Sequence, residues 1–102
     1  MDFSMALIHL RSGKRIGRDG WNGRGMFVWL NPGSADLETR NEAIEEYDAL
    51  IGGVGIALFE LGDDNTVTRM PNLNMRAADG STITGWLASQ SDMLAEDWEI
   101  VS

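Results

Sequence analysis

The side chains with the clearest capacity for binding chemistry in this sequence are its tryptophans. Four tryptophans in 102 residues is a high proportion, and Trp21 and Trp86 both lie where a predicted loop meets a strand end, beside Gly, Asn, Ser and Gln. An exposed indole among small polar residues can stack on a nucleobase, a contact worth about 1–3 kcal/mol per base. The alternative is that each of these two rings closes the core. Trp29, inside a strand, and Trp98, beside Ile100, are predicted to be structural.

Polar side chains follow Trp86 closely along the chain. They are Ser89, Gln90, Ser91, Asp92, Glu96 and Asp97. A carboxylate accepts well from an exocyclic amine or a ring N–H, so Asp97, between a predicted helical turn and the last strand, is a candidate acceptor for a base edge. Asp92 fits the first turn of that helix better, because the helix dipole favours a carboxylate there.

The sequence contains few residues that could support catalysis or bind a metal. Cysteine is absent and His9 is the single histidine, so the common pairs of nucleophile and base are missing. The run of Asp63, Asp64 and Asn65 is similar to a fragment of a calcium loop, but it lacks the ligand spacing and the closing Glu, and a hairpin turn is the simpler interpretation. We therefore expect no enzyme activity, no cofactor and no metal site.

Charge is distributed unevenly along the chain, whose formal net charge is −8. Residues 1–26 carry five Lys and Arg against two Asp, whereas residues 27–102 carry three Arg against fourteen carboxylates. This balance disfavours binding to DNA or RNA, since affinity for them comes largely from neutralising phosphates. A small anion can still meet a cationic patch, and Arg18, Arg24 and Arg76 are candidates for a pyrophosphate. The acidic excess leaves one alternative open: a nucleic-acid mimic that inhibits a host DNA-binding protein.

Length and apolar content suit one small domain that closes a single core, since 43% of the 102 residues are apolar. The absence of cysteine suits a reducing cytosol. No apolar run is long enough for a membrane span or a signal peptide, so neither is expected.

Hydrophobic spacing and turn residues predict the elements that hold the candidate side chains. Asp2 caps and Gly13 stops a first helix, and Asp79-Gly80 marks a hairpin turn. Ser89 or Ser91 caps a single helical turn near the end. The predicted helices lie at 2–12 and 37–51, with the helical turn at 92–95. The predicted strands lie at 14–18, 26–30, 55–61, 66–70, 72–78, 81–87 and 98–101.

This order of elements predicts an α+β fold. We expect a small single domain with an antiparallel sheet of five or six strands and one or two packed helices. The predicted turn-rich run at 19–23 carries Trp21, and Trp86 lies near the end of the strand predicted at 81–87.

Two segments carry a family resemblance, residues 19–26 (DGWNGRGM) and 85–101 (GWLASQSDMLAEDWEIV). Three features add to them: the opening DFxxAL helix followed by GKR, the aromatic strand after residue 26, and the RAADG hairpin at 76–80. The sequence resembles the second class of phage Thoeris anti-defence proteins, which act as signal sponges. The resemblance covers about 1–33 and 72–102, and the segment 34–71 reads as a variable insertion.

The resemblance implies sequestration of cyclic nucleotide immune signals. It implies a homotetramer that binds glycocyclic ADP-ribose without cleaving it, in pockets shared between protomers. It also implies that some members bind cyclic dinucleotides at separate sites. It also implies work in the cytoplasm of an infected or lysogenic bacterial host, with no DNA, RNA or membrane partner. The ligand-facing residues that it implies are Trp21, Asn22, Arg76, Trp86, Ser89, Gln90 and Asp97, with Arg76 on phosphate. Gly85 and Leu87 stand where relatives can carry more polar residues, so the resemblance leaves the base specificity open.

Overall fold

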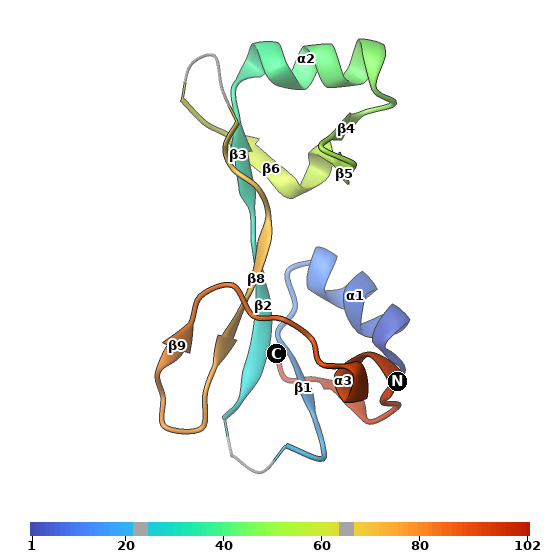
Figure 1. Ribbon diagram of the computed structural model, residues 1–102, viewed down its shortest axis with the longest axis vertical. Coiled ribbons are helices and arrows are strands. Elements are labelled where there is room, and N and C mark those ends of the chain that lie inside the picture. Colours follow the sequence, from blue (N-terminus) through green and yellow to red (C-terminus); the bar gives the residue numbers. More distant parts are fainter. Residues whose placement is uncertain (22–24, 64–66) are drawn as a thin grey trace. The chain divides into compact units, whose positions relative to one another are not determined.

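The computed structural model describes residues 1–21, 25–63 and 67–102, and the chain forms a small α+β domain built from two compact units (Figure 1). Unit 1 comprises Met1–Asn31 and Leu73–Ser102, and unit 2 comprises Pro32–Asn72. The α+β class is confirmed. Unit 2 spans nearly the same residues as the predicted variable insertion, whose variability stays a prediction.

Unit 1 is built on an antiparallel sheet of five strands in the order β10-β1-β2-β8-β9, as the sequence predicted. Its strands are β1 (Ile16–Arg18), β2 (Phe27–Asn31), β8 (Asn72–Arg76, whose first residue belongs to unit 2), β9 (Thr82–Ile83) and β10 (Trp98–Ile100). Its helices are α1 (Phe3–Arg11) and α3 (Gln90–Leu94). The predicted caps are confirmed: the Asp2 side chain accepts from the backbone N–H of Met5, and Ser89 caps α3.

The core of unit 1 lies between α1 and one face of the sheet. Its buried members are Ala6, Leu10, Ile16, Val28, Met75 and Trp98. Because successive side chains of a strand point to opposite faces, the burial of Val28 places Phe27 and Trp29 on the other face of the sheet. The burial of Met75 places Arg76 there as well. Trp29, predicted to be structural, therefore lies outside this core, whereas Trp98, 2% exposed, is structural as predicted.

Unit 2 combines a three-stranded sheet, a two-stranded hairpin and one α-helix. Its elements are β3 (Gly33–Ala35), α2 (Leu37–Glu46), β4 (Leu50–Ile51), β5 (Val54–Gly55), the 3₁₀ helix η1 (Ile56–Leu58), β6 (Phe59–Leu61) and β7 (Val67–Arg69). Strand β3 pairs in parallel with β6 and antiparallel with β7. The small core consists of Ala35, Ala43, Ile51 and Phe59.

Two predicted elements of unit 2 are shorter than the periodicity indicated. The helix predicted at 37–51 ends at Glu46, because Asp48 (φ 54°) and Ala49 (φ 63°) adopt left-handed conformations, and Leu50–Ile51 then forms β4. The strand predicted at 55–61 is interrupted by η1. In unit 1, the strand predicted at 81–87 is limited to Thr82–Ile83, although the hairpin at Asp79-Gly80 is confirmed.

Candidate functional site

Three of the four tryptophans form a cluster in unit 1, named here the tryptophan cluster: Trp21, Trp86 and Trp98. The centroids of Trp21 and Trp98 lie 5.4 Å apart with planes at 79°, and Trp86 lies 6.3 Å from each, at 75° and 78°. Trp98 is buried, while Trp21 and Trp86 are half-buried and pack against the core. Each ring therefore covers the core and still reaches solvent, and stacking on a nucleobase stays a prediction.

The start of α3 supplies polar groups beside the cluster. Ser89 and Asp92 form a capping box: each backbone N–H donates to the other's side chain at 3.0 Å. The preference for Asp92 as a first-turn residue is confirmed. Gln90, the first helical residue, is exposed.

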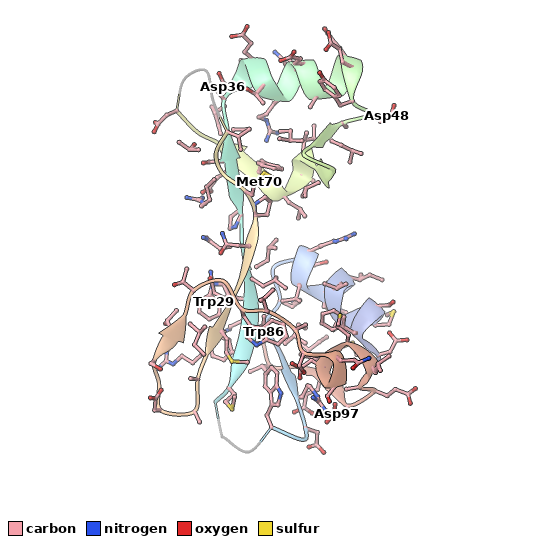
Figure 2. The ribbon with its side chains drawn as sticks, in the orientation of Figure 1. Trp29, Asp36, Asp48, Met70, Trp86 and Asp97 are labelled. Atoms are coloured by element: carbon pink, nitrogen blue, oxygen red, sulfur yellow. The ribbon has the colours of Figure 1, made fainter. Side chains whose placement is uncertain are left out.

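Arg18, at the end of β1, connects this helix start to the segment before β10. Its Nη1 donates to Asp92 Oδ1 and its Nε to Asp97 Oδ1, both at 2.8 Å. The other oxygen of Asp97 accepts from the backbone N–H of Gly20 at 2.8 Å. Asp97, labelled in Figure 2, thus has structural partners on both oxygens. Its side chain remains 31% exposed.

These contacts shift the ionisation of all three groups. Burial raises the pKa of the Asp92 carboxyl, but hydrogen bonds from Ser89, Arg18 and the Trp21 side chain outweigh it, and the pKa ends below its ordinary value. The pKa of Asp97 is lowered by its bonds to Arg18 and Gly20. Conversely, the pKa of the Arg18 guanidinium is raised by Asp97 and then Asp92. All three groups are charged at neutral pH.

Arg76 lies on the other face of the unit 1 sheet, in what we call the arginine face: Arg15, Phe27, Trp29 and Arg76. The Arg15 guanidinium carbon lies 4.8 Å from the centre of the Phe27 ring, and the Phe27 and Trp29 centroids lie 5.6 Å apart. Arg15, Phe27 and Arg76 line two hollows of about 480 and 450 Å³. The arrangement offers two cations and aromatic surface to an anionic ring compound.

The structure therefore joins some predicted site residues and separates others. Trp21, Trp86, Ser89 and Asp97 are connected through rings and hydrogen bonds, and Gln90 follows Ser89 on α3. Within one protomer, Arg76 faces away from this group. Asn22, as well as Arg24, lies outside the described residues.

Sequence reasoning missed Arg15 and Phe27 as partners of Arg76. The alternation of β2, with Val28 buried between Phe27 and Trp29, was the sequence pattern that could have shown an aromatic face. The bridge from Arg18 to two carboxylates carried no sequence pattern, since 74 and 79 residues separate its members.

Unit 2 contributes apolar and acidic surface. A hollow of about 530 Å³ is lined by residues of α2 and the hairpin that follows, with Glu42 and Asp48 among them. Within the described ranges, no three histidine or acidic side chains converge to hold a metal ion, and no helix has the length and apolar character to cross a bilayer.

Comparison with known proteins places the whole chain in one family. The family model described as Tad2-like, Thoeris anti-defense 2-like domain, matches residues 1–101. The protein named Thoeris anti-defense 2 from Bacillus phage SP01 is 33% identical over 102 residues, which cover 100% of this chain and 96% of that protein. Because the match takes in unit 2 as well as both segments of unit 1, the chain belongs to the Thoeris anti-defense 2-like family and is a phage anti-defence protein directed at Thoeris.

Proposed function

We propose that this protein binds and sequesters glycocyclic ADP-ribose, a cyclic nucleotide immune signal, without cleaving it, and so blocks activation of the effector that the signal would switch on. Its place of action is the cytoplasm of the infected or lysogenic host. Family membership supports the anti-defence role. The proposal of binding without cleavage rests on the sequence, which has one histidine and no cysteine to build a catalytic pair.

The observation that carries the proposal is the tryptophan cluster. Trp21 and Trp86 meet at 75°, so their rings do not stack on each other. Both rings are half-buried, so each keeps exposed surface on which a flat base can stack, a contact worth about 1–3 kcal/mol. Ser89, Gln90 and Asp97 lie close along the chain or through hydrogen bonds, and they supply donors and acceptors for base edges and ribose hydroxyls.

The proposed phosphate contact through Arg76 needs a second protomer. In one protomer, Arg76 and the tryptophan cluster lie on opposite sides of the unit 1 sheet, so a pocket that uses both is shared between copies. We propose a homotetramer that forms such shared pockets. Light scattering checks this assembly, and a monomer at micromolar concentration contradicts it.

The arginine face supports a second candidate ligand, a cyclic dinucleotide bound at a separate site. Arg15 and Arg76 flank Phe27, which pairs two cations with a ring on which a base can stack. Arg76→Gln distinguishes the two arrangements. If the pocket is shared, this substitution weakens the binding of glycocyclic ADP-ribose. If the sites are separate, it weakens only the binding of the dinucleotide.

One experiment tests the proposal against its competitors. The protein is incubated with glycocyclic ADP-ribose, separated from free ligand, and denatured by heat. We expect intact ligand to be released. A cleaved product contradicts sequestration and indicates an enzyme. Absence of ligand uptake contradicts nucleotide binding and favours the alternative, an acidic mimic, for which unit 2 supplies nine carboxylates against two arginines.

Ionic strength gives a second measurement. A pyrophosphate offers few ionic contacts, so nucleotide affinity should fall only modestly as salt rises. The affinity of an acidic mimic for a basic partner protein would instead fall steeply as salt rises.

A further inference from the structure

Arg18 joins two carboxylates that come from different parts of unit 1. Its Nε and Nη1 each donate at 2.8 Å, to Asp97 and to Asp92, and the side chain is 19% exposed. Hydrogen bonds between a guanidinium and ionised carboxylates are about twice as strong as neutral ones, and the planar fork fixes their direction. The charge of Arg18 is thus balanced inside the protein.

The Asp97 half of this bridge fixes the turn that carries Trp21. Asp97 accepts from the backbone N–H of Gly20 through its side chain and from that of Asp19 through its carbonyl, at 2.8 and 3.1 Å. The backbone N–H of Trp21 donates to the carbonyl of Arg18 at 3.2 Å. A Cβ at position 20 would lie 2.8 Å from Asp97 Oδ2, so only glycine fits without displacing that carboxylate. Each of these contacts restricts the backbone that positions the Trp21 ring.

The Asp92 half of the bridge holds another tryptophan of the cluster, Trp98. The carbonyl of Asp92 accepts from the indole N–H of Trp98 at 2.9 Å, and its carboxylate accepts from Arg18 Nη1 at 2.8 Å. Asp92 is 9% exposed, so these bonds form largely away from water. Arg18 therefore ties the residue that orients Trp98, the ring against which Trp21 packs, to the residue that fixes the Trp21 turn.

We propose that Arg18 is a positioning residue of the tryptophan site: by bridging Asp92 and Asp97 it sets the angle and spacing of Trp21 within the cluster, and it does not contact the ligand. The inference rests on the proposed function for its effect on nucleotide binding. Its effect on the cluster itself can be measured without ligand.

The test compares Arg18→Gln and Arg18→Lys with the wild-type protein and a matched control, Arg69→Gln. Arg69 also pairs with a carboxylate at 2.8 Å, Glu60, but this pair lies in unit 2 and is 40% and 61% exposed. Two quantities are measured well below each variant's melting temperature. They are the near-ultraviolet circular dichroism of the ligand-free protein, which reports coupling between indoles, and the affinity for glycocyclic ADP-ribose by calorimetry.

We expect Arg18→Gln to change the tryptophan dichroism of the ligand-free protein and to weaken binding by about 10- to 100-fold. Arg18→Lys keeps the charge but not the fork, so it should recover part of both signals. The control should match the wild type in both measurements. Far-ultraviolet dichroism checks that every variant is folded at the temperature used.

Each other outcome has a definite meaning. If Arg18→Gln loses affinity while its ligand-free dichroism is unchanged, Arg18 contacts the ligand and the proposal is wrong. If both signals are unchanged, or if full affinity returns once the variant is cooled until it is fully folded, Arg18 supports only stability and the proposal is also wrong. If the wild type itself binds no nucleotide, the proposed function fails, and the dichroism alone still decides whether Arg18 positions the cluster.

Discussion

Unit 1 and unit 2 differ in what their side chains can do. Unit 1 contains all four tryptophans and six of the eight Lys and Arg residues, and its formal net charge is −1. Unit 2 contains no tryptophan, and its nine carboxylates against two arginines give −7. Flat rings can stack on a base and cations can pair with phosphates, and both are concentrated in unit 1.

The two units also differ in the size of the side chains that their cores bury. Unit 1 buries Leu10, Ile16 and Val28 almost completely and sets Trp98 among them. Half of the buried members of the unit 2 core are alanines, Ala35 and Ala43. A large core can hold several indoles at fixed angles, because each ring packs against others that cannot move. The comparison indicates that the proposed binding residues depend on the unit 1 core far more than on unit 2.

The largest expected effect follows from the burial of Trp98. Trp98→Ala should lower the free energy of unfolding by about 3–5 kcal/mol, since it empties the centre of the unit 1 core. Trp29→Ala, on the half-exposed arginine face, should lower it by only about 1–2 kcal/mol. Urea unfolding followed by the remaining tryptophan fluorescence measures both. Equal losses would show that the arginine face is as buried as the core.

The second prediction separates binding from folding. Trp21→Ala and Trp86→Ala should each weaken the binding of glycocyclic ADP-ribose by about 1–3 kcal/mol, which is up to two powers of ten in affinity. Leu61→Ala in unit 2, where Leu61 is 68% exposed, is the control and should bind as the wild type does. Asp97→Ala should lose both affinity and melting temperature, because Asp97 holds Arg18 and Gly20.

Equal affinity of wild type, Trp21→Ala and Trp86→Ala would remove the tryptophan cluster from the site. If the two tryptophan variants melt early but keep their affinity, the rings contribute to stability and not to binding.

A third prediction perturbs unit 2 alone. An added Cβ at Gly33 would lie 2.7 Å from side-chain atoms of Phe59 and Pro71 and 2.8 Å from the Arg69 carbonyl, so Gly33→Ala should cost about 1–3 kcal/mol. Gly55→Ala meets no atom within 4 Å at an ordinary φ of −59° and should cost little. The single tyrosine, Tyr47, lies in unit 2 and reports its unfolding.

Nucleotide affinity of folded Gly33→Ala should match that of the wild type, since the proposed binding residues lie in unit 1. A loss of affinity as large as that of Trp21→Ala would show that unit 2 takes part in binding.

The smallest expected effect is a dependence on pH. The pKa values of Asp92 and Asp97 are lowered in the folded protein, so the stability that these carboxylates provide is present above their unfolded pKa of about 4. It is lost as pH falls through the lowered folded values. The free energy of unfolding should therefore be nearly constant between about pH 5 and 7 and fall below about pH 4. Urea titrations of wild type and Arg18→Gln measure this, and the same slope in both would contradict a role for the Arg18 bridge.

Local sequence patterns predicted much of unit 1 because short-range physics decides it. Asp2 and Ser89 offer the side-chain oxygens that a helix start needs, and Asp79-Gly80 allows the left-handed φ of 87° at Gly80. The same patterns were less useful in unit 2. There α2 ends at Glu46, before the left-handed residues Asp48 and Ala49, although the apolar spacing of the sequence continues to Ile51.

By itself, the sequence determined the family, the α+β class, the helix caps and the set of residue types that can bind a nucleotide, because these depend on composition, on motifs and on contacts within a few residues. Only the tertiary structure decided which of those residues meet. Sheet order and strand alternation put Trp21 and Trp86 against Trp98 and turned Trp29 and Arg76 to the opposite face. The Arg18 bridge to Asp92 and Asp97 likewise exists only because antiparallel pairing of β1 with β10 brings distant residues to bonding distance.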